Sequence, residues 1–353
     1  MPIRLQFHGA SRSVTGSCFA LDNGRCRILI DCGMFQGSKT EKELNYRDFP
    51  FVPRDIHAML LTHAHIDHSG LIPKLVKHGF QGPILATGAT VDLCSVMLPD
   101  SGHIQEVEVD QLNRRNARRG LPHVTPIYTA EDATAAMTQC RPVTLGAWAQ
   151  AGPGIRARYW NAGHLLGSAS IEVEVQHDER PPVRVLFSGD IGPDDKLLEH
   201  APEGPSGVDY VLCESTYGDT DRLETNFTRR RALLRAELEA AKRRDGALLI
   251  PSFAVERTQE LLVDIVALMQ AGSVPQAPIF IDSPLASRAS AIFARHAREI
   301  PAGDDLTRAL AMPNVRVTES VEQSKAIGRL SGFHIISAAS VMCEAGRIRH
   351  HLR

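Results

Sequence analysis

The stretch "LLTHAHIDHSG" (residues 60–70) places four potential metal ligands within six residues, directly after an apolar run. His63 and His65 are two residues apart. Residues i and i+2 of an extended backbone point to one side, so one ion can contact both. Asp67 and His68 follow the end of the strand, where a turn can direct them to a neighbouring ion. Imidazole and carboxylate suit zinc, and iron and manganese are the chemical alternatives. The stretch therefore predicts a metal site.

Three further residues at the ends of predicted strands could complete this site. His164 lies in "WNAGHLLGSA" (160–169), between two strands. Asp190 ends "VLFSGD" (185–190), where a carboxylate could bridge two ions. Asp31 ends "ILID" (28–31) and could orient a histidine ligand from behind. Since a single histidine or strand-end aspartate is an ordinary structural residue, the prediction depends on the HxHxDH cluster.

Composition restricts the class of protein. The 353 residues are enough for two domains. The net charge of −2 gives no global field that would attract nucleic acid, so any such binding must use local patches. The seven cysteines are scattered without a CxxC pair, which favours reduced thiols and a cytoplasmic protein. The N-terminus does not resemble a signal peptide, and no apolar run approaches the roughly 20 residues of a membrane span, so we expect no membrane association.

The two halves of the chain differ in rhythm. Short apolar strands dominate the first half, with helices predicted near residues 69–78 and 104–119. A Pro/Gly-rich break at 200–208 precedes strands that alternate with helices, which predicts a parallel sheet covered by helices. We therefore expect an α/β sandwich in residues 1–205 and a Rossmann-like α/β domain in residues 206–353.

The sequence is similar to known families in both halves. "THAHIDH" (62–68), with Asp31, His164 and Asp190 at matching strand ends, resembles the metallo-β-lactamase fold, an αββα sandwich with a dinuclear metal site on one edge. Four later segments resemble the β-CASP nucleases, the branch that processes RNA and DNA. They are "CESTYGD" (213–219), "PSFAVERTQELL" (251–262), "IFIDSPLA" (279–286) and "CEAGRIRHHL" (343–352). Together these resemblances cover nearly the whole chain.

The resemblance implies a role for each matching residue. The first metal would be held by His63, His65 and His164, the second by Asp67 and His68, with Asp190 as the bridge and Asp31 behind the ligands. Glu214 and His351 match the family's motifs A and B. The implied enzyme is a zinc-dependent ribonuclease, endonucleolytic or also 5′-exonucleolytic, that hydrolyses RNA by a metal-bound hydroxide oriented by Asp67. Glu214 and His351 would then form a hydrogen-bonded pair that protonates the leaving oxygen.

Single-stranded RNA is the expected substrate. Ser252, Arg257 and Ser283 lie in loops that follow strands and precede helices, where backbone N–H groups favour phosphate. The main basic clusters lie at 114–120, 229–231 and 242–244. Each of these clusters is equally well explained as a solvated helix face.

The sequence departs from the family at three places. Val341 and Glu256 stand where glycine is usual in the family. The chain also stops two residues after His351, before the motif C histidine. We therefore expect a truncated sandwich, a second zinc site that is incomplete, and uncovered edges that favour a homo-oligomer.

Two other functions fit the same residues. One is a promiscuous hydrolase of small esters, lactams or phosphodiesters that uses the same metals, with manganese as an alternative to zinc. The other is a non-catalytic partner subunit, which the absent motif C histidine would explain.

Overall fold

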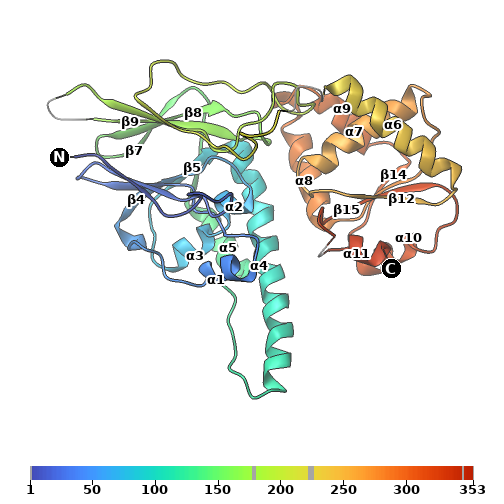
Figure 1. Cartoon of the computed structure of the whole chain (residues 1–353), viewed down its shortest axis with the longest axis horizontal. Helices are drawn as coiled ribbons and strands as arrows, with labels where there is room; N and C mark the ends of the chain where they lie inside the picture. The colour runs from blue at the N-terminus through green and yellow to red at the C-terminus, as the bar shows by residue number, and fades with distance from the viewer. Residues whose placement is uncertain (1, 177–179, 222–225, 344–345, 353) are drawn as a thin grey trace. The chain divides into compact units, whose positions relative to one another are not determined.

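The computed structural model describes residues 2–176, 180–221, 226–343 and 346–352. The chain divides into two compact units (Figure 1). The first comprises Met1–Pro193 and Ala201–Gly218, and the second comprises Asp194–His200 and Asp219–Arg353. The segment Asp194–His200 thus packs with the second unit, although first-unit residues flank it on both sides.

The first unit contains two sheets. One has six strands in the order β1-β2-β3-β4-β5-β6, antiparallel from β1 to β3 and parallel from β3 to β6. Its strands are β1 Arg4–Phe7, β2 Phe19–Asp22, β3 Arg27–Ile30, β4 Ile56–Leu60, β5 Ile84–Thr87 and β6 Cys140–Val143. The other has five strands in the order β11-β10-β9-β8-β7, antiparallel except for the β10–β11 pair. Its strands are β7 Trp148–Gly152, β8 Ile155–Asn161, β9 Ala169–Val175, β10 Val183–Phe187 and β11 Tyr210–Leu212.

The inner faces of the two sheets form one hydrophobic core. Ile28 and Leu60 of the first sheet and Ile171 and Val173 of the second are fully buried in it. Strand β8 alternates buried and partly exposed residues, as expected for a strand with one face on a core. The buried Tyr159 also donates a hydrogen bond to the backbone oxygen of Leu85, 2.8 Å away, and so joins the sheets.

Among the described residues of the first unit, the α-helices are α1 Lys39–Leu44, α2 Ile66–Ser69, α3 Ile72–Lys77, α4 Gly88–Ala117 and α5 Ala130–Ala136. Helix α4 is 30 residues long, and in Figure 1 it is the cyan helix that extends beyond the sandwich. The helix predicted at 104–119 corresponds only to the exposed C-terminal half of α4. The buried first half carries Pro99 and an apolar composition, which obscure the helical pattern in the sequence.

The second unit is a four-stranded sheet in the order β12-β15-β13-β14, and all of its strand pairs are parallel. Its strands are β12 Ala247–Pro251, β13 Ile279–Ile281, β14 Val315–Val317 and β15 His334–Ala338. Its helices are α6 Phe227–Arg243, α7 Arg257–Gln270, α8 Pro284–Arg295, α9 Gly303–Leu310, α10 Val321–Ile327 and α11 Ile348–His351. This confirms the Rossmann-like arrangement. Among the described residues, no helix combines the length and apolar character needed to cross a membrane.

Candidate metal centre

The histidine cluster lies where a buried strand turns into a short helix. Strand β4 pairs with β3 and β5, and residues 61–65 continue from its end. His65 is the N-cap of α2, whose first turn carries Asp67 and His68. The same short stretch therefore presents two histidines from the segment that follows the strand and two further ligand candidates from a helical turn.

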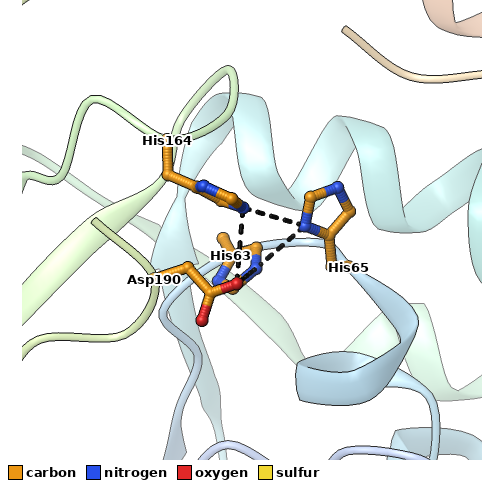
Figure 2. Close-up of side chains that lie close together, drawn as sticks. All are labelled: His63, His65, His164 and Asp190. Carbon is orange, nitrogen blue, oxygen red and sulfur yellow. Dashed lines mark hydrogen bonds and ion pairs between the residues drawn. The ribbon is translucent and has the colours of Figure 1, made fainter. Parts of the chain in front are cut away.

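The second sheet supplies two more candidates. His164 lies in the loop between β8 and β9, and Asp190 follows the end of β10. The backbone N–H of Ala169 donates a hydrogen bond to the backbone oxygen of Thr62 at 2.9 Å. This bond connects the end of the His164 loop to the histidine stretch. Figure 2 shows the side chains of His63, His65, His164 and Asp190 converging on one point.

The donor atoms of these four residues have spacings that suit a tetrahedral ion. His65 Nδ1 lies 3.1 Å from both His63 Nε2 and His164 Nε2. Asp190 Oδ2 lies 3.8 Å from His63 Nε2 and 3.4 Å from His164 Nε2. Ligands about 2.0–2.1 Å from a tetrahedral ion are about 3.3 Å apart. The four atoms, all within 4.8 Å of one another, therefore fit one metal ion.

The other oxygen of Asp190 faces a second group of donors. Asp190 Oδ1 lies 3.1 Å from His68 Nε2. One oxygen of the carboxylate therefore faces the histidines of the four-donor group, and the other faces His68. Asp67 is on the same turn as His68. This arrangement fits a bridging carboxylate with His68 on its far side.

A buried hydrogen-bond network supports the ligands from behind. Asp31, 1% exposed, contacts His68 Nδ1 at 2.7 Å and accepts the Thr62 N–H at 2.9 Å. Thr62 Oγ1 lies 3.0 Å from Asp31 and 3.0 Å from His63 Nδ1. Ser17 donates a further hydrogen bond to Asp31. Asp31 thus orients His68 directly, and Thr62 connects it to His63.

Electrostatics favour a cation in this place. Burial alone would raise the pKa of Asp190, but nearby histidines, His68 above all, lower it to about 2. Burial opposes charge on His68, yet Asp31 and Asp190 raise the pKa of this imidazole well above its usual range. Burial raises the pKa of Asp67. The charge of His68 lowers this pKa, and the charge of Asp190 raises it further. The carboxylates of this site therefore favour positive charge beside them, as a ligand set for a divalent ion should.

Glycine allows the two second-sheet loops to approach closely. A Cβ on Gly192 would lie 1.6 Å from the backbone oxygen of Gly163, in the loop that carries His164. Only a residue without a side chain fits this contact. Gly192 therefore holds the loops of His164 and Asp190 in register.

We expect Gly192→Ala to lower zinc affinity by about 10–100-fold, because the methyl group must push the two loops apart. Gly204→Ala is the matched control, since a Cβ there would meet nothing within 4 Å. Isothermal titration with Zn²⁺ measures both variants. Equal affinity in the two would show that the loops accommodate the methyl group without moving the ligands.

Glu214 has local partners within the first unit. Its carboxylate accepts hydrogen bonds from the Ile191 and Thr216 N–H groups, each at 3.1 Å. Its own N–H donates to Ser188 Oγ at 3.0 Å. Glu214 thus holds the residue that follows Asp190. The acid role predicted for it, in a pair with His351, stays a prediction.

The predicted phosphate contacts lie in the second unit. Ser252, 1% exposed, shares hydrogen bonds of 2.8 Å with Thr258 and Ser337. Ser283 is also buried, and it caps α8 by accepting the Ala286 N–H at 3.2 Å. Arg257 is half-exposed and pairs with Glu260 at 2.8 Å. Substrate binding by these three residues stays a prediction, and the two serines already have structural roles.

His351 belongs to a polar cluster around Asp282, which sequence reasoning missed. His351 Nε2 and Arg347 Nη1 each lie 2.7 Å from the fully buried Asp282 carboxylate. Ser324 donates to the same carboxylate at 2.6 Å, and Thr318 Oγ1 contacts it too. A buried aspartate directly after a strand of a parallel sheet was the available signal, because it must find partners.

The Asp282 cluster gives a pH-dependent stability. Burial alone would raise the pKa of Asp282, but hydrogen bonds, first from Ser324 and Thr318 and then from His351 and Arg347, lower it below 3.8. A carboxyl whose pKa is lowered by folding stabilises the protein above its unfolded pKa, and this contribution disappears as the pH falls through the folded value.

We therefore expect wild-type protein to lose more stability between pH 6 and pH 3 than Asp282→Asn does. Thermal unfolding followed by circular dichroism gives the two pH profiles. Asp304→Asn, an exposed change at the start of α9, is the control. Parallel profiles for wild type and Asp282→Asn would contradict the expectation.

The sandwich and its histidine–aspartate centre define a metallo-hydrolase of the β-lactamase type. A family model described as the metallo-β-lactamase superfamily matches residues 13–93, and a model of the β-CASP domain matches residues 258–353. Ribonuclease TTHA0252 from Thermus thermophilus is 37% identical over 99% of this chain and 76% of its own length. The chain belongs to the β-CASP family of the metallo-β-lactamase superfamily.

Other relatives are more distant. Transcription termination factor FttA from Methanothermobacter thermautotrophicus is 30% identical over 79% of this chain, but only 42% of that relative is covered. A crystal structure of a protein of unknown function from Enterococcus faecalis V583 aligns with 96% of this chain and 77% of its own, with a TM-score of 0.51 and 13% identity. That likeness shows the fold alone.

Proposed function

We propose that this protein is a metal-dependent ribonuclease that hydrolyses phosphodiester bonds of single-stranded RNA. The observation that carries the proposal is the four-donor centre of His63, His65, His164 and Asp190. It stands in a chain that is similar along 99% of its length to a protein named as a ribonuclease. The metal we propose is zinc, in two sites that share Asp190.

The ligands divide between the two proposed ions. His63, His65 and His164 would hold the first, and Asp67 and His68 the second. When bound, such ions supply Lewis-acid polarisation of the phosphate and lower the pKa of a water in the site.

The chain's own residues do the positioning. Asp31 keeps His68 in one orientation through its 2.7 Å contact. Asp190 turns one oxygen toward His164 and the other toward His68. Asp67 is on the same turn as His68, and its carboxyl interacts with the charges of His68 and Asp190, which supports a role in orienting the attacking water.

A cleavage assay tests the proposal. Purified protein is incubated with 5′-labelled single-stranded RNA and Zn²⁺ or Mn²⁺, and His164→Ala serves as the inactive control. We expect cleavage that a chelator abolishes and added metal restores. Metal-loaded protein that leaves RNA intact would overturn the proposal, and efficient turnover of bis-p-nitrophenyl phosphate or nitrocefin instead would favour a small-molecule hydrolase.

A further inference from the structure

The outer half of α4 and the segment that returns from it form an arm of the first unit, residues 104–127 (Figure 1). The base of α4 is attached to the loop that carries His164. The hydroxyl groups of Thr87 and Thr90 donate to the Gly167 oxygen at 2.6 and 2.8 Å. At about 1.5 Å per residue, the outer end of the helix lies about 40 Å along its axis from this loop. The arm therefore offers a surface away from the metal centre, within the same compact unit.

The outer end of the arm is basic, in a chain whose net charge is −2. Residues 111–130 include four arginines and no aspartate or glutamate. The four, all exposed, are Arg114, Arg115, Arg118 and Arg119. Arg114 pairs with Asp110 at 2.6 Å. The side chains of the other three make no hydrogen bond or ion pair within the part of the chain that the structure describes. Three guanidinium groups are thus available to a ligand.

The stability of the helix accounts for only part of this charge. Cations in the last turn of a helix interact favourably with its dipole, which gives Arg114 and Arg115 a structural role. Arg118 is the C-cap and Arg119 follows the helix, whereas the dipole effect falls off within the last turn. Arg114 and Arg118 are also four positions apart, a spacing at which like charges repel each other. An exposed helix face that serves only solvation typically mixes both signs.

Hydrogen bonds hold the arginine-bearing end in one shape. The Asn113 side chain donates to the Val124 oxygen and accepts the Val124 N–H, each at 2.9 Å. The Asn116 side chain donates to the Pro122 oxygen at 3.0 Å. These bonds join the returning segment to the turns that carry the arginines. An ordered surface loses less conformational freedom on binding than a flexible tail does.

We propose that Arg115, Arg118 and Arg119 form a phosphate-binding surface for single-stranded RNA. A guanidinium group suits this ligand because it pairs with two phosphate oxygens at once. A stacked strand advances about 3.4 Å per nucleotide, so at least about 12 nucleotides reach from the His164 loop to this surface. The surface therefore helps to hold long RNA and has no effect on short RNA at the centre. The inference rests on the proposed function for the identity of the polyanion.

Fluorescence anisotropy in the presence of a chelator measures RNA binding without cleavage. The probe is labelled oligouridine of about 30 nucleotides, long enough to reach both places. Wild type is compared with the triple variant Arg115→Gln, Arg118→Gln and Arg119→Gln. The slope of log affinity against log salt concentration should become shallower by about 2, because each lost phosphate contact accounts for about 0.7. The affinity at about 0.1 M salt should fall about tenfold or more.

Two further triple variants are the controls. Arg115→Lys, Arg118→Lys and Arg119→Lys together retain the charge and should keep most of the affinity. The other variant removes the same charge from exposed positions of the first unit outside the arm and should bind like wild type. Its changes are Arg4→Gln, Arg47→Gln and Arg54→Gln.

The cleavage reaction gives a second readout. With metal-loaded protein and RNA of about 30 nucleotides, the glutamine variant of the arm should have a KM about tenfold higher and an unchanged kcat. RNA of about 6 nucleotides is too short to reach the arm, and both proteins should cut it equally well.

Equal affinity and salt slope in wild type and the glutamine variant of the arm would overturn the inference. An equal loss in the variant outside the arm would do the same, because it would indicate an effect of total charge. Poly-glutamate that binds wild type as tightly as the RNA does would point to an acidic protein as the partner instead. Wild type that binds RNA through the arm and leaves it intact would overturn the ribonuclease proposal alone.

Discussion

Asp190→Asn is expected to lower metal affinity by more than about 100-fold and to reduce RNA cleavage accordingly. Outer partners of metal ligands typically account for 10–100-fold in affinity, and a direct ligand shared by two ions, the role proposed for Asp190, should exceed that. Asp190 has one oxygen 3.4 Å from His164 Nε2 and the other 3.1 Å from His68 Nε2. Asparagine preserves the shape but loses the charge and turns an NH₂ group toward one set of donors.

Metal content after dialysis, measured by plasma mass spectrometry, checks this result together with the cleavage rate. Asp55→Asn, at an exposed position of the same unit, is the matched control and should retain both metal and activity. An Asp190→Asn protein with full metal content would show that Asp190 is not a ligand. Loss of only one of two equivalents would assign it to one ion and not to a bridge.

Local patterns in the sequence accounted for most of the fold. The spacing of His63 and His65 after an apolar strand predicted that their side chains converge, on the basis of strand geometry. Their donor atoms do converge, although the strand itself ends at Leu60. The alternation of strands and helices predicted the parallel sheet of the second unit for a similar reason. The resemblance then matched His164 and Asp190 to the centre, and their donor atoms do lie within 4.8 Å of those of His63 and His65.

Long-range contacts were beyond such patterns. Thr62 connects Asp31 to His63, but nothing local distinguishes it from an ordinary strand-end threonine. The approach of Gly192 to Gly163 joins the β8–β9 loop to the connection between the parallel strands β10 and β11. Glu256 contacts Lys196, sixty positions away, so its departure from glycine could be noted in the sequence and explained only in the structure.

Asp31→Ala is expected to lower the unfolding free energy of the first unit by about 3–5 kcal/mol in metal-free protein. The carboxylate is 1% exposed and accepts hydrogen bonds from Thr62 and Ser17, besides its contact with His68. Alanine removes the carboxylate that accepts from the buried Thr62 N–H and from Ser17, and it leaves His68 with Asp190 as its remaining carboxylate partner. A buried donor that loses its acceptor costs more free energy than an exposed one. The φ of 58° at Asp31 adds to the penalty, because aspartate tolerates left-handed backbone better than alanine does.

Tryptophan fluorescence in urea measures this effect selectively, because both tryptophans, Trp148 and Trp160, lie in strands of the first unit. Asp31→Asn is the matched variant: it tolerates the same backbone and its amide oxygen still accepts from Thr62, so about half of the loss should be recovered. Metal binding at the His68 side should weaken by about 10–100-fold in both variants, because His68 loses the carboxylate that orients it. Wild-type stability in Asp31→Ala would mean that water replaces the carboxylate, and that the ligands are held in place by the sandwich alone.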